Sequence, residues 1–300
     1  MILLTGATGT VGVRLLPKLI AAGRELRVLV RDPQDLGSSR VDVQLALGDL
    51  ADATSLRHST RGVETVVHLA GSFRDQDHRT GGGTIEEVNG LATARLLRAA
   101  EEAGAKRFIF LSCLGADPLS PSRAMRSRAS AEADLLESDL QVTVLASSVI
   151  DSPDSIWERI AAGLCRLPIA PLPAASRRAL VQPVSASDVA SAVFAEISSD
   201  SRDTDGGGRR IELAGDQVVD QFSYMSALAM RRRHRSVQLP VSLVKAKMRV
   251  LSKLADSGRA PTEDEIELLT LSLQSRDGSA GLRQLGIDPT PVNPLITRPE

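Results

Sequence analysis

The first twelve residues, MILLTGATGTVG, constrain the fold more than any other stretch of the chain. Residues 2–4 have the apolar character of a short buried strand, and the apolar side chains of residues 11–20 recur at helical spacing. Gly6, Gly9 and Gly12 therefore fall where a strand turns into a helix. At such a turn a dinucleotide pyrophosphate can lie on free backbone N–H groups at the positive end of the helix.

The sequence that follows supports a dinucleotide site. Residues 26–30 (LRVLV) predict a second strand, and Asp32 stands twenty positions past Gly12, as the dinucleotide-binding pattern requires. The alternative is an ordinary strand–helix turn in which the glycines serve only steric needs. The order of strand, glycines, helix, strand and acidic residue favours the dinucleotide site over that alternative.

The chain up to residue 150 alternates between strand and helix patterns. We predict further strands over 41–47, 63–69, 107–112 and 140–145. One helix is expected to begin at Asp52, and two more are expected over 85–103 and 122–138. Loops are expected over 32–40 and 72–84. This alternation predicts an α/β fold with a doubly wound parallel sheet. In such a sheet the ligand lies beyond the carboxyl ends of the strands.

The pattern past residue 150 is less regular. It predicts helices over 156–164, 188–197, 222–230, 243–254 and 263–273, a short strand over 209–213 and a loop over 198–208. We expect a dinucleotide-binding domain made of residues 1–150 plus 183–197. Residues 151–182 plus 198–300 would form a smaller, substrate-side part.

Composition and charge exclude several classes of protein. Hydrophobic residues make up 42% of the chain, enough for a sizeable core, and the net charge of −1 gives no electrostatic argument for nucleic acid. The basic run at 231–235 is interpreted as a solvated helix end. Two distant cysteines and four scattered histidines predict no metal site. With no signal-peptide pattern and no run of eighteen apolar residues, we expect a cytoplasmic protein without a membrane span.

An ordered series of motifs resembles the atypical short-chain dehydrogenase/reductase group, in particular the NmrA-like NAD(P)-binding proteins and the dinucleotide-binding accessory subunit of respiratory complex I. The glycine motif alone is shared with many enzymes, whereas the ordered series is more specific. Its members are TGATGTVG at 5–12, VLVRDP at 28–33, GDL at 48–50, VVHLAG at 66–71, VNG at 88–90, AGAKRFIFLS at 103–112 and VQPVSASDVA at 181–190.

The resemblance implies a set of cofactor-binding residues. The pyrophosphate would be surrounded by Gly6, Thr8, Gly9, Thr10, Val11 and Gly12. The adenosine ribose would lie at Arg31 and Asp32, and the adenine at Asp49 and Leu50. The cofactor path would be lined by Leu69, Ala70 and Gly71, and the nicotinamide riboside would lie at Ser112 and Arg128. Arg31 can meet a 2′-phosphate and Asp32 a 2′-hydroxyl. Adjacent strand residues point to opposite sides, and Pro33 turns the chain after Asp32, so we expect Arg31 to face the ribose. The expected cofactor is NADP, with NAD as the alternative.

The chain departs from the resemblance at the proton-transfer residues. The family's reductases and epimerases use a Tyr and a Lys four residues later, because a nearby cation favours the ionised form of a phenol whose pKa is about 10. Counted back from Glu132, the Tyr position holds Ala124 and the Lys position holds Arg128. Arg128 keeps the charge but cannot give up a proton. The only tyrosine, Tyr224, lies far downstream.

Two functions from different classes remain. The first is an oxidoreductase acting on a small organic or quinone-like molecule, with its proton taken from water or from the substrate. The second is a non-catalytic dinucleotide-binding protein, either a redox sensor or an assembly subunit. No catalytic residue is assigned, and Ser112, with no base beside it in the sequence, is expected to have a structural or cofactor-contact role. A pocket opposite the nicotinamide would favour the enzyme.

Overall fold

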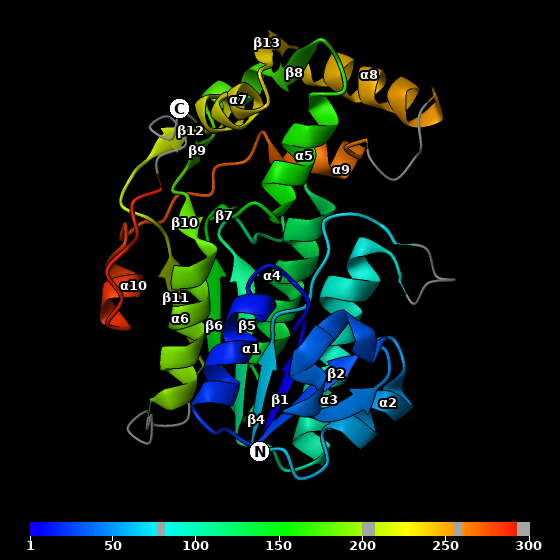
Figure 1. Ribbon diagram of the computed structural model, residues 1–300, viewed down its shortest axis with the longest axis vertical. Helices are drawn as coiled ribbons and strands as arrows, with labels where there is room; N and C mark the ends of the chain where they lie inside the picture. The colour runs from blue at the N-terminus through cyan, green and yellow to red at the C-terminus, as the bar shows by residue number, and fades with distance from the viewer. Residues whose placement is uncertain (77–81, 200–207, 255–259, 293–300) are drawn as a thin grey trace.

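One parallel sheet organises the larger part of the molecule. The computed structural model describes residues 1–76, 82–199, 208–254 and 260–292. Within these ranges seven strands pair in the order β11-β6-β5-β4-β1-β2-β3, and every pair is parallel. They are β1 (Ile2–Thr5), β2 (Leu26–Val30), β3 (Gln44–Leu47), β4 (Thr65–His68), β5 (Arg107–Cys113), β6 (Gln141–Ser147) and β11 (Arg209–Leu213) (Figure 1). The order reverses at β1, which lies between β2 and β4, and this confirms the doubly wound sheet.

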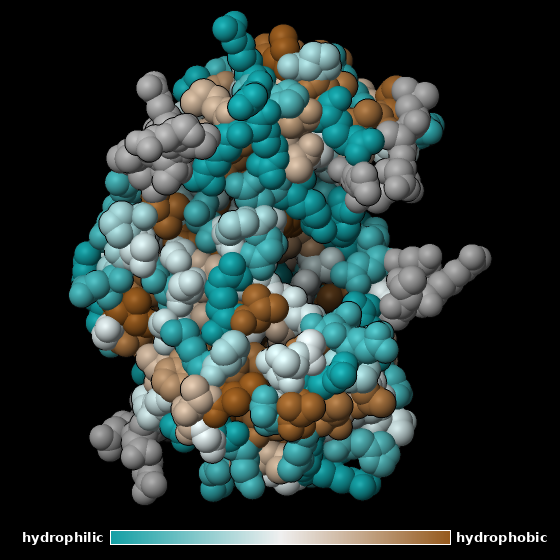
Figure 2. Space-filling model, viewed as in Figure 1, coloured by the Kyte–Doolittle hydropathy of each residue, from teal (hydrophilic) through white to brown (hydrophobic). Residues whose placement is uncertain are grey.

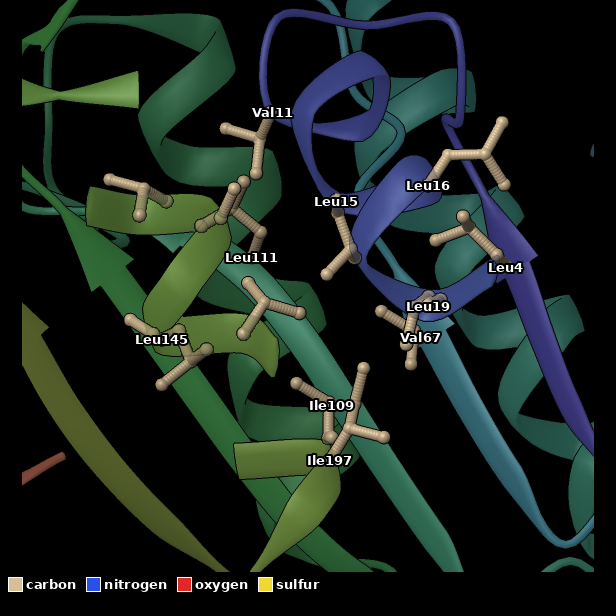
Figure 3. Close-up of a cluster of buried hydrophobic side chains, with 14 of the residues drawn as sticks. Leu4, Val11, Leu15, Leu16, Leu19, Val67, Ile109, Leu111, Leu145 and Ile197 are labelled. Carbon is tan, nitrogen blue, oxygen red and sulfur yellow. The ribbon is translucent and has the colours of Figure 1, made fainter. Parts of the chain in front are cut away.

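Helices cover both faces of this sheet (Figure 1). One face packs against α1 (Gly12–Ala21) and α6 (Ala186–Ser198), and the other against α2 (Ala53–Ser59), α3 (Ala92–Glu102) and α4 (Arg123–Leu136). Figure 3 shows Leu15 and Leu19 of α1 packed towards Val67 and Ile109 of the strands. Burial of each such side chain contributes about 1.5–3 kcal/mol to folding.

The alternation of side chains along β5 shows why the sheet needs helices on both sides. Phe108 and Phe110 are buried against the face covered by α3 and α4, and Ile109 and Leu111 against the face covered by α1 and α6. A strand with apolar residues on both faces is stable only where both faces are covered. The near-continuous apolar run RFIFLSC at 107–113 therefore forms a central strand.

A smaller part lies beyond the carboxyl ends of the strands (Figure 1). It contains α5 (Ile156–Leu164), α7 (Gln221–Arg231), α8 (Val241–Leu254) and α9 (Glu263–Leu268), which share a separate apolar cluster. Three short strand pairs complete it: β7 (Ile150–Asp151) with β10 (Val184–Ser185), β8 (Ile169–Pro173) with β13 (Arg235–Leu239), and β9 (Leu180–Val181) with β12 (Val219–Asp220). The 3₁₀ helix η4 (Ala174–Arg177) lies between β8 and β9. None of the helices in the described ranges has the length and apolar character to cross a bilayer.

The segment after β2 differs from the expected loop. Residues Pro33–Val41 form a 3₁₀ helix, η1, which is interrupted at Gly37. The Asp32 carboxylate caps it by accepting the N–H of Gln34 at 2.8 Å, and a proline at the first helical position suits a helix start. The strand expected over 41–47 is correspondingly shorter and begins at Gln44.

The long helix expected over 85–103 contains a π-helical turn. This turn, η3 (Glu87–Leu91), precedes α3, and a π-helical turn is often found near a functional site. Asn89 lies within it, and its buried side chain accepts the N–H of Ser72 and donates to the Ser72 carbonyl, both at 2.8 Å. The π-helical turn therefore anchors the backbone that follows Gly71.

Two expectations for the smaller part need correction. The helix expected over 263–273 ends at Leu268, because the chain then turns and the Leu273 N–H bonds to the Leu180 carbonyl at 2.7 Å. Residues 209–213 form a strand as expected, but this strand pairs with β6 at the edge of the large sheet instead of lying in the smaller part. Residues 77–81 of the expected loop 72–84 and residues 200–207 of the loop 198–208 lie outside the described residues. The short helix α10 (Ala280–Gln284) packs on β11.

Candidate functional site

The glycine-rich turn between β1 and α1 has the geometry of an anion site. Gly6 has φ +76°, in the left-handed region that favours glycine, and a Cβ at this position would lie only 2.6 Å from the Ala70 nitrogen. At Gly12 a Cβ would lie 2.1 Å from the Gly6 carbonyl oxygen, so this glycine closes the turn itself. Among the described residues no acceptor contacts the N–H groups of Thr10, Val11 and Gly12. Three unbonded N–H groups at a helix start suit a pyrophosphate.

A cavity of about 290 Å³ lies on one side of this turn. Its wall includes Arg31, Asp49 and Leu50, which were expected at the adenosine, together with Thr8 from the expected pyrophosphate site and Ala70 from the expected cofactor path. Asp49 accepts the Ala51 N–H through Oδ1 at 2.8 Å, whereas its buried Oδ2 has no partner within the described part of the chain. A buried acceptor without a donor is costly, and an adenine amino group would satisfy it. The residues present therefore fit the adenosine half of a dinucleotide.

The structure separates Arg31 from Asp32. Arg31 lines the adenosine-side cavity, whereas Asp32 does not and instead caps η1 through the Gln34 N–H. Of the residues that the sequence proposed for the cofactor, Asp32 alone lines neither this cavity nor its neighbour. The chain turns into η1 at Pro33, and this turn brings the Asp32 carboxylate to the Gln34 N–H and away from the cavity.

A larger cavity, of about 510 Å³, adjoins the other side of the glycine turn. Figure 2 shows the recess between the sheet and the smaller part. The two cavities share Gly6, Gly9, Leu69, Gly71 and Gln76. The expected residues Thr10, Val11, Gly12, Ser112 and Arg128 also line the larger one. Its far wall comes from the smaller part, with Ser155, Ile156, Trp157, Arg159 and Leu273.

A contact between α1 and the segment before α5 closes one rim of this cavity. Arg14 donates to the Ser152 hydroxyl at 2.6 Å and to both carboxylate oxygens of Asp154 at 3.0 and 3.1 Å. The Thr10 hydroxyl donates to the Asp154 carbonyl at 3.1 Å. The hydrogen bonds to Arg14 help to lower the pKa of Asp154 despite the opposing effect of burial, so its carboxylate stays ionised. The glycine turn is thereby tied to the start of α5.

Helix α4 supplies a charge to the larger cavity but no hydroxyl at the Tyr position. Ala124 is fully buried outside the lining, and Met125 and Arg128 face the cavity. Arg128 is itself buried, donates to the Leu111 carbonyl at 3.2 Å and lies over the ring of Phe73 at 5.1 Å. Its Nε is buried and has no hydrogen-bond partner among the described residues.

Tyr224 does not replace the missing phenol. Its side chain is fully buried in the smaller part, lines neither cavity and donates to Asp151 at 2.8 Å. Burial and the neighbouring Asp151 raise the pKa of Tyr224 well above the usual value. The phenol therefore stays protonated and remote from the cavity.

Ser112 has a base beside it, contrary to the expectation from the sequence. Its hydroxyl donates to Oε1 of Glu132 on α4, and the other oxygen of Glu132 accepts from Arg210 at 3.0 Å. Twenty residues separate Ser112 from Glu132, and only the packing of α4 on the end of β5 brings them together. Next to it, burial raises the pKa of the Cys113 thiol, so the thiol stays neutral.

His68 forms a buried neutral link beneath the cavity floor. Thr93 donates its hydroxyl hydrogen to the Asn89 carbonyl at 2.7 Å, so it accepts from Nε2–H of His68 at 3.0 Å. Nδ1 then accepts from the Thr5 hydroxyl at 2.6 Å. Burial, together with the smaller effect of the Arg128 guanidinium, lowers the pKa of His68 to about 3. This histidine orients the ends of β1 and β4 and does not titrate near neutrality.

Several lining residues had no signal in the sequence. Arg74, Trp157 and Arg159 belong to segments interpreted as a loop and an ordinary helix, and no motif marks them. Arg74 and Arg159 meet at Glu265, which is 191 residues from Arg74 and 106 from Arg159. No group of three or more His, Cys, Asp or Glu side chains that could hold a metal ion exists among the residues described.

Comparisons with known proteins support dinucleotide binding. A family model described as NAD(P)H-binding matches residues 6–162, which is more than half of the chain. The chain is 35% identical over 125 residues to "Sterol demethylase protein B" of Methylococcus capsulatus, covering 41% of this chain and 37% of that protein. It is 28% identical over 254 residues to "NADH dehydrogenase [ubiquinone] 1 alpha subcomplex subunit 9, mitochondrial" of Arabidopsis thaliana, covering 80% of this chain and 60% of that protein. In both cases the match spans less than two thirds of the relative.

Solved structures share the fold. The NADPH-dependent quinone oxidoreductase of Escherichia coli, determined in complex with NADPH, superposes with a TM-score of 0.71 at 19% identity, over 97% of this chain and 96% of that one. A nucleoside-diphosphate-sugar epimerase from Staphylococcus aureus superposes with a TM-score of 0.69 at 18% identity, over 97% of both chains. At these identities the likeness concerns the fold alone.

Proposed function

Because the chain belongs to the NAD(P)H-binding family, we propose that it is an NADP(H)-dependent oxidoreductase acting on a small carbonyl or quinone-like molecule. The observation on which this proposal rests is the larger cavity. It begins at the glycine turn, passes the ends of β4 and β5, and is bounded on the far side by α5 and Leu273. Its volume of about 510 Å³ lies in the range of ligand pockets, roughly 300–1,000 Å³.

The residues of the chain would divide the work of binding between the two cavities. The N–H groups at Thr10–Gly12 would hold the pyrophosphate, and Arg31 would meet the 2′-phosphate. Arg128, which lines the larger cavity, would hold ribose hydroxyls through its guanidinium group. When bound, the nicotinamide supplies hydride. The apolar wall made by Trp157 and Leu273 would keep water away from the substrate carbonyl.

The proton must come from a source other than the usual phenol. Ala124 offers none, Arg128 stays charged, and Tyr224 is buried elsewhere. Water or the substrate remains as the donor, and a quinone, whose reduced form is an acid in its own right, depends least on a protein donor. A positioned acid or base contributes about a hundred- to ten-thousandfold to rate, so we expect slow turnover.

The test is NADPH oxidation against ketones, aldehydes and quinones, followed over pH. We expect slow turnover with a flat profile around neutrality. A fast rate with a profile shaped by a group that titrates near pH 7 would mean that a protein residue transfers the proton, and Glu132→Gln would show whether the Ser112–Glu132 pair does so. No turnover with any acceptor, combined with tight NADPH binding, would contradict the enzyme.

The second candidate function is a non-catalytic dinucleotide-binding subunit or redox sensor. It is favoured by the absence of a Tyr–Lys pair from α4 and by the relative from Arabidopsis, whose printed name is that of a subunit of NADH dehydrogenase. A protein of this class would bind NADPH tightly and leave the larger cavity without a substrate. The acceptor panel therefore distinguishes the two functions.

A further inference from the structure

Positive charge is concentrated in one segment of the smaller part. Between Asp220 and Asp256 the sequence contains eight arginines and lysines and no Asp or Glu, although the net charge of the whole chain is −1. The described residues of this segment form α7, β13 and α8. Together with β8, which pairs with β13, these elements make up the end of the molecule opposite the N-terminus (Figure 1). The cations of this segment therefore gather at one end of the molecule.

Carboxylates of α5 and α9 pair with half of these cations. The pairs are Arg231 and Arg232 with Glu158, Lys245 with Glu267, and Arg249 with Glu263. The remaining cations are exposed and have no carboxylate partner among the described residues; these are Arg233, Arg235, Lys247 and Lys253. Their charge is therefore available to an anionic partner.

The outward side of α8 combines apolar and cationic side chains. Leu243 and Val250 are 44% and 57% exposed, and their spacing in the sequence places them two turns apart on one side of the helix. Lys247 lies between them on the same side, and Lys253 follows Val250 by about one turn. Two exposed aliphatic side chains are thus flanked by two of the lysines that have no carboxylate partner in the described part of the chain.

The outward side of the β8–β13 pair has a similar composition. Arg235 and Val237 are exposed, and residues two apart on a strand point to the same face of a sheet. Ile169, the register partner of Arg235 on β8, is 50% exposed. Here too an exposed cation lies beside exposed aliphatic side chains.

These two outward sides belong to one end of the molecule. Val244 and Met248 of α8 and Ala170 and Leu172 of β8 are buried in the same apolar cluster, so the exposed residues of both elements face away from that cluster. Figure 2 shows hydrophilic and hydrophobic residues mixed at this end. Neither of the two cavities at the glycine turn has a described lining residue from 221–254. The surface is therefore separate from the dinucleotide site.

Aliphatic side chains among cations favour a lipid bilayer over nucleic acid as the partner. An anionic bilayer attracts cations to its surface, and exposed aliphatic side chains gain free energy when they enter the boundary between headgroups and acyl chains. Proteins that bind single-stranded nucleic acid stack its bases on exposed aromatic rings. Phe222 and Tyr224, the only Phe, Tyr or Trp residues between Asp220 and Asp256, are buried.

We propose that the outward sides of α8 and of the β8–β13 pair form a docking surface for an anionic lipid bilayer. Arg235, Lys247 and Lys253 lie near the lipid phosphates in this arrangement, and Leu243 and Val250 enter the headgroup boundary. The contact is peripheral and holds the protein on the membrane surface. It goes beyond the proposed function and does not depend on it, because the docking surface and the two cavities share no described residue.

Co-sedimentation with lipid vesicles tests the docking surface. The full-length protein would be mixed with vesicles of phosphatidylcholine alone, or of phosphatidylcholine and phosphatidylglycerol in equal parts. We expect the protein to sediment with the anionic vesicles and to stay in solution with the neutral ones. Added salt should weaken the binding, because salt screens exposed charges.

Two double variants identify the residues that make the contact. Each cation near an anionic bilayer contributes roughly fivefold to binding, so Lys247→Gln combined with Lys253→Gln should lose roughly tenfold or more. Leu243→Ser combined with Val250→Ser should bind more weakly than wild type at every salt concentration, because salt does not screen the contribution of apolar burial. All four side chains are exposed, so the thermal midpoint of unfolding should stay nearly unchanged.

The matched control removes two cations from another part of the surface. Lys18, on α1, and Arg24, just before β2, are exposed and have no carboxylate partner within the described ranges. Lys18→Gln combined with Arg24→Gln changes the net charge by the same amount as the double lysine variant. It should bind the anionic vesicles as wild type does.

Several outcomes would overturn the proposal. These are no sedimentation with anionic vesicles at low salt, equal binding to both kinds of vesicle, wild-type binding by either double variant of the docking surface, or an equal loss in the control. Binding to duplex DNA that is tighter than binding to anionic vesicles, and that is lost in the double lysine variant, would instead assign the surface to nucleic acid.

Discussion

The substitution Arg31→Ala tests the cofactor preference most directly. Arg31 follows the last residue of β2 and lines the adenosine-side cavity, in which Asp49 offers an unbonded oxygen. The competing carboxylate of Asp32 is held by the Gln34 N–H at 2.8 Å and lies outside that cavity. The side chain that meets the 2′ position of the ribose is therefore expected to be cationic, and NADPH is expected to bind more tightly than NADH.

The size of the effect follows from one charge-assisted contact. Such a contact contributes about 1.5–3 kcal/mol, which is roughly ten- to a hundredfold in affinity. Arg31 is exposed, so salt screens its charge, and we expect the lower end of this range at physiological ionic strength. The loss should shrink as salt is raised. NADH, which lacks the 2′-phosphate, should change by less than about threefold.

Calorimetric titration of NADPH and NADH into wild type, Arg31→Ala and Asp32→Asn measures these differences. Asp32→Asn keeps a capping side chain at the start of η1 and removes only its charge, which makes it the matched control. The reasoning is refuted if wild type binds NADH more tightly, or if Arg31→Ala weakens both cofactors equally. A tenfold loss of NADH affinity in Asp32→Asn would show that Asp32 meets the ribose.

Two further predictions concern the glycine turn and the buried histidine. Gly9→Val should abolish binding of NADPH and NADH and leave the thermal midpoint of unfolding nearly unchanged. The reason is that a Cβ at this position meets only the Gly6 carbonyl, at 3.3 Å, and otherwise points into the cavities. Unchanged affinity for both cofactors in calorimetry would rule out this site. Gly12→Ala should instead destabilise the fold, since its Cβ would overlap that same carbonyl at 2.1 Å. The pKa of His68 is about 3 in the folded protein and near 6.5 in the unfolded chain. Between these two pH values only the unfolded chain carries a proton on this imidazole. The free energy of unfolding should therefore fall by about 1.4 kcal/mol for each pH unit below pH 6.5. Denaturant titrations should show that His68→Gln removes this dependence on pH, and an equal slope in both proteins would contradict the prediction.

The sequence determined the sheet and the turn at its centre. Apolar runs such as 26–30 and 107–112 form strands because their periodicity and burial are local properties, and both were placed to within a residue. Gly6 was recognised for the same reason, since a tight turn between strand and helix needs its conformation whatever surrounds it. The sequence alone also shows that position 124 is not a Tyr, whatever the tertiary structure is.

Secondary structure that depends on neighbours was less predictable. Residues 33–41 became a 3₁₀ helix because one carboxylate capped it, and the π-helical turn at 87–91 exists where Asn89 holds the backbone of Ser72. The edge strand at 209–213 was recognisable as a strand, but its partner was not. Pairing partners follow from the whole topology, and the alternation of side chains along one strand gives no indication of which edge it joins.

The tertiary structure alone decided the chemistry of the larger cavity. Ser112 acquired a base because α4 packs Glu132 onto the end of β5, and Glu265 accepts from both Arg74 and Arg159, which lie 191 and 106 residues away from it in the sequence. The electrostatics of a cavity wall depend on which charged side chains pack together there. These contacts form between segments that are far apart in the sequence, and neither segment alone indicates its partner. The sequence by itself thus determined where a dinucleotide could lie, and the packing of distant segments determined what could lie beside it.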